Sequence, residues 1–283
     1  MSVKVAVVEL GSDARESFNQ AIQLIGGIDD LNTPQRLVIV KVGVFDHRTN
    51  HHTSVNVADA IINSFDKAPK IFLAESENYK GKALERLQKW NTLFSERVVP
   101  FDLSGDAETK QVKVADETIG LSHILFKPNV FVSTHVLRTY EKGSILKNLL
   151  GLIPDRKKVR FHKRLEETLL DLYKAVGVVD LAVLDGTYLC SGIEPSSSST
   201  NANIVIVGRN AVAVEAVGYA LVGLDPEKVP IINEAMNRGI GEGRIDRIQV
   251  LGESFESAKE KITQLLKASK KKTKKSKTEK KAN

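Results

Sequence analysis

Hydrophobic residues recur along the chain with two alternating spacings. Nearly continuous apolar runs, such as VIVKVGVF at residues 38–45, are typical of strands that a parallel sheet buries on both faces. Between these runs, segments such as residues 165–176 carry apolar side chains three or four positions apart, which is the spacing of a helix with one buried face. The alternation predicts an α/β fold with a mainly parallel, mixed sheet and flanking helices.

Turn and capping residues mark the expected ends of these elements. The predicted strands are residues 3–10, 37–45, 70–74, 97–103, 111–114, 123–134, 180–184, 203–207 and 245–251. The predicted helices are residues 13–25, 57–65, 81–94, 165–176 and 211–222, with shorter ones after Ser144 and towards Met236 and an amphipathic helix before the C-terminal tail. The elements fit one domain over residues 1–266, with the alternative of two lobes, residues 1–120 and 121–266.

Positive charge is concentrated at the C-terminal end of the chain. The net charge is +6, but residues 267–283 hold nine lysines and one glutamate, so residues 1–266 carry a net charge of −2. This tail lacks the apolar side chains needed to form a core, and it is expected to be disordered. It is either a solubilising extension or an electrostatic tether to nucleic acid or the ribosome.

Cysteine content and hydropathy exclude several classes of protein. Cys190 is the only cysteine, so the chain has no internal disulfide and cannot hold an iron–sulfur cluster of its own. His47, His51 and His52 resemble metal ligands but fall in a probable loop segment, and no metal site is expected. The sequence has no run of about 18 apolar residues and begins without a signal-peptide pattern, so a cytoplasmic protein that does not enter a membrane is expected.

One helix start has an unusual residue for its position. In GSILKNLLGLIP, Ser144 is a good N-cap, but Lys147 stands where a capping box would have Glu or Gln. Either Lys147 extends into solvent, or Lys147, Asn148 and the first helix amides bind a phosphate or carboxylate. The stretch from Lys142 to Arg164 supports an anion site, because it contains eight Lys or Arg residues, one acid and His162, a candidate proton donor.

Lys41 interrupts the most apolar predicted strand. A lysine in a buried run is costly unless its ammonium group is paired or reaches the end of the strand. Asp46, Asp185 or Glu215 are its candidate partners, and the alternative is that Lys41 extends past the sheet into water.

Three further charged residues lie beside predicted strands or inside a predicted helix. Asp185 follows the strand LAVL, at the type of strand end where open α/β sheets bind ligands, although Asp is also a common turn residue. Arg209 stands between a strand and a helix and could face an anion. Glu215 is the only charge in AVAVEAVGYALVG, so it is either at an exposed edge or buried with a partner such as Lys41 or Arg209.

Four segments follow one another along the chain: SILKNLLGLIP followed by His162, then LAVLDGTYLCSGIEP, IVIVGRNAVAVEAVGYALVGLDPEKVP and NRGIGEG. Through these segments the sequence, from about residue 37 to residue 252, resembles the prokaryotic family known as domain of unknown function 362. The resemblance implies an α/β fold with a polar site. The matching positions are Lys41, Lys147, Asn148, Gly151, His162, Asp185, Gly186, Gly192, Gly223 and Gly241.

The chain also departs from the family pattern. The family usually has Pro-Lys-x-Lys-Thr-His where this sequence has HVLRTY at residues 135–140, which retains one basic residue, Arg138, and the threonine. An aspartate of the family is Glu215 here, and its Lys-Pro-Asn is Lys41-Val42-Gly43. Many relatives look like iron–sulfur proteins through an added cysteine module that this chain does not contain.

Three functional hypotheses follow from these features. In the first, the protein binds or transforms an anionic small molecule: Lys41, Arg138, Lys147, Asn148 and Arg209 bind the ligand, while Asp185, Glu215 and His162 are the candidate catalytic groups. In the second, it is a non-enzymatic protein that binds nucleic acid or the ribosome through its tail. In the third, suggested only by the iron–sulfur relatives, it assists a redox or cofactor-assembly complex. Cofactor and reaction are left open.

Overall fold

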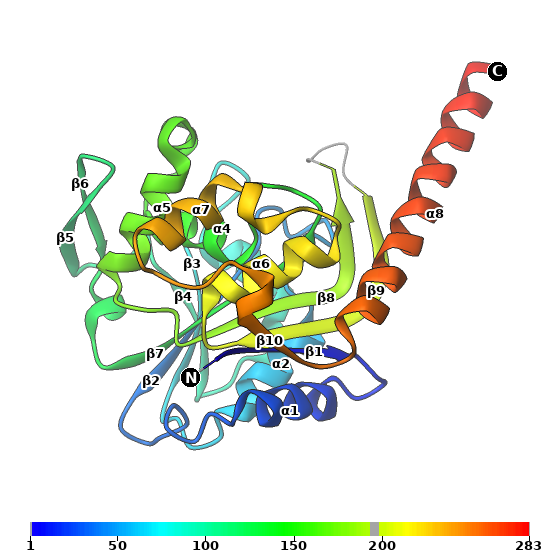
Figure 1. The fold of residues 1–283 in the computed structure, drawn as a ribbon. Helices are drawn as coiled ribbons and strands as arrows, with labels where there is room; N and C mark the ends of the chain where they lie inside the picture. Colours follow the sequence, from blue (N-terminus) through cyan, green and yellow to red (C-terminus); the bar gives the residue numbers. More distant parts are fainter. Residues whose placement is uncertain (1, 193–197, 283) are drawn as a thin grey trace.

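A mixed sheet of eight strands forms the centre of the protein (Figure 1). The computed structural model describes residues 2–192 and 198–282. The strands of this sheet are, in chain order, β1 (Val3–Glu9), β2 (Leu37–Val42), β3 (Ile71–Glu75), β4 (Val98–Asp102), β7 (Asn129–Arg138), β8 (Leu181–Ser191), β9 (Ser198–Gly208) and β10 (Ile248–Gly252). Their spatial order is β10-β1-β9-β8-β7-β2-β3-β4. The predicted α/β class with a mainly parallel, mixed sheet is confirmed.

Strand β9 alone runs against the direction of the others. It is antiparallel to both β8 and β1, whereas the remaining neighbours pair in parallel. The residues that follow β9 therefore lie at the opposite edge of the sheet from those that follow β2, β3, β7 and β8.

Helices cover both faces of the sheet, because its strands alternate buried side chains between two layers. In β1, Val5 and Val7 pack into one core, and Ala6 and Val8 pack into the other. Helices α1 (Ala14–Ile25) and α2 (Val55–Ser64) cover the second of these faces. The opposite face is covered by α4 (Ile145–Asn148), α5 (Leu165–Ala175), α6 (Ala211–Leu221) and α7 (Pro230–Asn237).

The short elements are joined to this frame. β5 (Thr109–Val114) and β6 (Glu117–Ser122) form a separate antiparallel hairpin. Its turn residues Ala115 and Asp116 have φ values of 47° and 70°, as a type I′ turn requires. The remaining short helices are α3 (Ala83–Leu87), η1 (Gln88–Leu93), η2 (His123–Phe126), η3 (Leu149–Leu152), η4 (Val159–Arg164), η5 (Pro226–Lys228) and η6 (Ile245–Arg247).

Some predicted boundaries differ from those observed. The expected strand at residues 123–134 begins with the η2 turn, and β7 continues to Arg138. β8 and β9 extend beyond the apolar segments that predicted them, because their antiparallel pairing continues through polar residues as far as Ser191 and Ser198. Pairing with a neighbour, rather than hydrophobicity, decides the length of these strands.

β2 and β7 are adjacent in the sheet, but the connections that follow them lead in opposite directions. β2 is followed by α2 and then by β3 on one side, whereas β7 is followed by α4 and α5 and then by β8 on the other side. Connections that diverge in this way leave a crevice outside the carboxyl ends of the two strands. Strands from both sides of residue 120 pair in this sheet, β2 with β7 and β1 with β9.

Helix α8 (Phe255–Ala282) packs against the body of the protein near its start and then extends away from it (Figure 1). Ala258 and Ile262 are buried in the core, whereas the later part of α8 projects outward. Side chains are described only as far as residue 269, so the expected disorder of residues 267–283 stays a prediction.

Candidate functional site

A cavity of about 560 Å³ lies at the carboxyl ends of β2, β3 and β7. Segment 144–162, which follows β7, forms its other wall. Among the described residues that line it, the Lys and Arg residues are Lys41, Arg138, Lys147, Arg156, Lys157 and Lys158, and the only carboxylate is Glu75. Its position is the crevice expected where the connections of β2 and β7 diverge.

Lys41 is fully buried at the base of the cavity and is paired, as its sequence context predicts. Its Nζ atom lies 2.8 Å from Oε1 of Glu75 and 2.9 Å from Oδ1 of Asn148. The candidates Asp46, Asp185 and Glu215 are wrong as its partners. Glu75 is the last residue of β3, and the parallel register that places Lys41 beside Ala74 brings the Glu75 carboxylate to the ammonium group.

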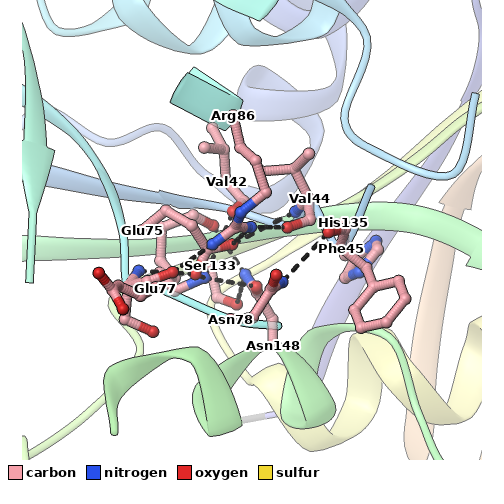
Figure 2. A network of polar contacts seen from close by, with 12 residues as sticks. Val42, Val44, Phe45, Glu75, Glu77, Asn78, Arg86, Ser133, His135 and Asn148 are labelled. Carbon is pink, nitrogen blue, oxygen red and sulfur yellow. Dashed lines mark hydrogen bonds and ion pairs between the residues drawn. The ribbon is translucent and has the colours of Figure 1, made fainter. Parts of the chain in front are cut away.

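Arg86 also pairs with the Glu75 carboxylate (Figure 2). Its guanidinium group is 3.5 Å from Oε2 of Glu75 and donates hydrogen bonds to the backbone carbonyls of Val44 and Ser76. Two buried cations therefore surround one buried carboxylate, which leaves Glu75 with no excess negative charge to offer to a ligand.

Asn148 connects the strand ends to helix α4. Its Oδ1 atom accepts from Lys41, and its Nδ2 atom donates to the backbone carbonyl of Lys41 at 2.7 Å and to that of Thr134 at 3.1 Å. Nδ2 also lies 3.2 Å from Oγ of Ser133 (Figure 2). Asn148 was predicted to bind the ligand, and the structure places it at the cavity with its amide engaged by β2 and β7.

Gly151 permits the close approach of η3 to this cluster. A Cβ atom at this position would lie 2.6 Å from Nζ of Lys41 and 2.7 Å from Oε1 of Glu75. A larger residue would therefore displace the ion pair, which explains why glycine follows the Lys-Asn helix.

Glu215 caps the start of the helix at Ser144. The neighbouring sequence provides no capping carboxylate, because Lys147 stands where Glu or Gln is expected. From α6, Glu215 accepts hydrogen bonds from the backbone N–H of Ser144, at 2.8 and 3.0 Å, and from that of Leu146, at 2.8 Å. The predicted anion at these amides is thus a side chain of the protein, 71 residues further along the chain. Burial raises the pKa of Glu215 to about 7, although these backbone donors act in the opposite direction.

Lys147 lines the cavity and contacts a neutral aromatic group. Its Nζ atom lies 3.1 Å from the hydroxyl oxygen of Tyr140 and 4.6 Å from the centroid of the same ring. Burial, together with the positive charges of Arg138 and Lys142, lowers the pKa of Lys147 to about 8. The alternative in which Lys147 only extends into water is wrong.

Arg138 reaches the cavity from the end of β7. Its guanidinium group lies 3.0 Å from Nε2 of His135 and 3.4 Å from the backbone carbonyl oxygen of His51. Burial and the charges of Arg138, Lys41 and Lys147 hold the pKa of His135 well below its ordinary value. His135 is therefore mainly neutral at pH 7 and adds no further positive charge beside Arg138.

The basic segment that follows η3 forms the outer wall. His162 is exposed at the cavity, and partial burial together with Lys147 and Lys142 lowers its pKa. Lys158 donates to the backbone carbonyl of Glu77, and burial lowers its pKa to about 8. Because the pKa of His162 is lowered, its ring is mainly neutral at pH 7, and its role as a proton donor stays a prediction.

Three predicted site residues lie outside the cavity lining: Glu215, which caps α4, and Asp185 and Arg209. Asp185 is buried in β8, where its carboxylate accepts from the backbone N–H of Ser54, at 2.5 Å, and of Thr187, at 2.8 Å, and so holds the start of α2. Arg209 forms a surface ion pair with Asp30, with N–O distances of 2.8 and 2.9 Å. Arg209 follows the reversed strand β9, which places it at the opposite edge of the sheet.

Sequence reasoning missed several residues of the cavity. Glu75, His51 and His135 carry its other titratable groups, and Phe45 and Tyr79 pack edge to face at 5.1 Å in its wall. A signal existed for Glu75, since it is an acid directly after a predicted apolar strand. His51 was considered only as a possible metal ligand, and nothing in the local pattern distinguished His135, Phe45 and Tyr79 from ordinary strand and loop residues.

The described residues were also compared with the requirements of metal sites and membrane spans. No group of three or more His, Cys, Asp or Glu side chains within residues 2–192 and 198–282 is arranged to hold a metal ion. In that part of the chain, every helix is too short or too polar to cross a lipid bilayer.

Comparison with known proteins identifies the family but no reaction. A search of curated proteins finds no match to this chain. A family model described as a domain of unknown function, DUF362, matches residues 38–220. That span includes both walls of the cavity, from Lys41 to His162, and more than half of the chain. The chain is therefore a member of the DUF362 family.

Proposed function

We propose that the protein binds an anionic small molecule in the cavity at the ends of β2, β3 and β7. One observation carries this proposal: among the described lining residues, six Lys or Arg side chains face one carboxylate, and that carboxylate is already paired with Lys41 and Arg86. Positive charges gathered in a partly enclosed space repel one another, and a ligand with two or more negative charges would relieve that repulsion.

The size and the walls of the cavity indicate what else the ligand carries. A volume of about 560 Å³ matches a metabolite-sized molecule rather than a polymer. Phe45, Tyr79 and Tyr140 supply aromatic surface beside the cations. The ligand in this proposal has an anionic end held by Arg138, Lys147 and Lys158 and a less polar body against the aromatic rings.

Asp185 and Glu215 have no proton-transfer role in this proposal, because both carboxylates accept hydrogen bonds from backbone N–H groups and lie outside the cavity lining. His162 remains at the cavity as a ring that is mainly neutral at pH 7 and could exchange a proton with a ligand.

Calorimetric titration with inorganic pyrophosphate and with citrate tests the proposal. We expect at least one of these anions to bind, and both Arg138→Gln and Lys147→Gln to weaken that binding about tenfold or more, since a hydrogen bond to a charged group contributes about 1.5–3 kcal/mol. Lys163→Gln is the matched control, because it removes the same charge from an exposed position outside the cavity lining. Equal affinities in all four proteins would place the bound anion elsewhere, and absence of binding by both anions would count against the proposal.

A second candidate function concerns the tail. Residues 267–283 carry a net charge of +8, and α8 extends away from the body of the protein. Lysine without arginine or aromatic residues favours contact with phosphates rather than stacking on bases. This candidate is a tether to nucleic acid or the ribosome.

Truncation after Leu266 separates the two functions. We expect the truncated chain to lose retention on immobilised RNA at low salt, and the full chain to lose it as salt rises from about 50 to about 200 mM. Pyrophosphate binding in the cavity should be unchanged by the truncation. RNA retention that survives the truncation would show that the tail is only a solubilising extension.

A further inference from the structure

We propose that the amine of Lys147 forms an imine with the carbonyl group of an anionic aldehyde or ketone bound in the cavity. The inference rests on the proposed function, because the surrounding cations would hold the anionic end of such a molecule. It adds a substrate class, oxo acids and phosphorylated carbonyl compounds, and it assigns a covalent role to one lysine.

The lysines of the cavity are not equivalent. Lys41 is committed to the Glu75 carboxylate at 2.8 Å and to Asn148. Lys158 donates to the backbone carbonyl of Glu77, and Lys157 is exposed to solvent. Lys147 donates to the neutral Tyr140 hydroxyl, and no ion pair joins it to a carboxylate within the described residues.

An amine in this setting is a nucleophile at neutral pH. Lysines that form imines are activated by desolvation and by neighbouring cations, because both disfavour the ammonium form. Both features are present here, since burial and the charges of Arg138 and Lys142 lower the pKa of Lys147 to about 8. Glu215 contributes to positioning, because it caps the short helix that carries Lys147.

Tyr140 is placed to move the protons that the reaction requires. The nitrogen lone pair of Lys147 forms a bond to the carbonyl carbon, and the carbonyl oxygen takes up a proton, giving a carbinolamine. Tyr140, whose hydroxyl lies 3.1 Å from Nζ, gives its proton to that oxygen and takes one from the nitrogen. Loss of the oxygen as water then leaves the imine, and no oxidant or reductant is consumed. Burial raises the pKa of Tyr140, so the phenol is protonated at the start.

Reductive trapping tests the inference. The full chain is incubated with pyridoxal 5′-phosphate, an aldehyde that carries a phosphate, and the imine is reduced with sodium borohydride and located by peptide mass spectrometry. We expect Lys147 to be the dominant modified lysine, with modification suppressed by excess pyrophosphate or citrate. Lys147→Arg keeps the positive charge and should reduce total adduct at least tenfold, whereas Tyr140→Phe should slow its formation on Lys147.

Lys163→Arg is the matched control, because it makes the same change at an exposed site outside the cavity and should leave the adduct on Lys147 intact. Adduct spread evenly over exposed lysines, or equal trapping by the wild type and Lys147→Arg, would overturn the inference. Binding of pyrophosphate or citrate without adduct on Lys147 would reject the imine and leave the proposed function standing. If neither anion binds and no adduct forms, both proposals fail.

Discussion

Lys41 is a charged residue in an otherwise apolar strand, and its hydrogen-bond and ion-pair partners make its burial possible. It has no exposed surface, and its ammonium group is bonded to Glu75, Asn148 and the backbone carbonyl of Val42. Burial lowers the pKa of Lys41, and the Glu75 carboxylate counteracts that effect. The cost of burying the charge is offset only while all of these partners are in place.

Replacement of Lys41 by methionine should therefore destabilise the protein strongly. The change leaves Glu75 buried with only Arg86, at 3.5 Å, as its cation. Loss of one member of a buried pair costs about 3–5 kcal/mol, and we expect a value near the lower end because Arg86 remains. Urea unfolding monitored by circular dichroism measures this loss. Lys67→Met, at an exposed position, is the control and should change stability by about 0.5 kcal/mol or less. A loss below about 1 kcal/mol in Lys41→Met would contradict the pairing.

Helix α4 is an element whose stability comes from elsewhere in the chain. It has four residues, the side chain of Ser144 forms no capping bond, and an isolated helix of this length is unstable in water. Glu215, from α6, accepts hydrogen bonds from the backbone at the start of α4. Asn148, at the end of α4, bonds to the ends of β2 and β7. The position of Lys147 in the cavity thus depends on contacts that are distant in sequence.

The pH dependence of stability tests the role of Glu215. Its pKa is about 7 in the folded protein against about 4.5 ordinarily, so the folded state binds more protons between these values. The stability of the wild type relative to Glu215→Gln should therefore be highest below about pH 4.5, fall as pH rises to about 7 and then level off. The total change is about 3 kcal/mol, from a pKa difference of about 2.5 between the folded and unfolded states.

Urea unfolding of both proteins at several pH values between 5 and 8 provides the measurement. Subtracting the stability of Glu215→Gln from that of the wild type leaves the effect of Glu215 alone, because the buried histidines titrate in both proteins. Glu96→Gln, at an exposed site, serves as the matched control for loss of a carboxylate. A wild-type stability that rises relative to Glu215→Gln over this range would mean that the backbone donors outweigh burial.

At the scale of the whole molecule, strand order decides which charged residues meet. The apolar runs predicted the strands, and the basic stretch after Lys142 predicted an anion site near Lys147. Lys41, Arg138, Lys147, Asn148 and His162 do lie together at the cavity. Arg209 does not, because β9 runs in the reverse direction, and Asp185 instead holds α2. Hydrophobic spacing contains no information about strand direction or order, so these two outcomes could not be read from it.

The sequence by itself determined the α/β class, most of the helices and strands, and the concentration of lysine in the tail, because these depend on local spacing and composition. Only the tertiary structure decided that Glu75 pairs with Lys41, that Glu215 caps the helix at Ser144, and that the basic segment closes a cavity over the ends of β2, β3 and β7. The physical reason is that each of these contacts joins groups from separate elements. Their distances are decided by strand order and by the packing of the helices on the sheet, and neither leaves a periodic signal in the chain.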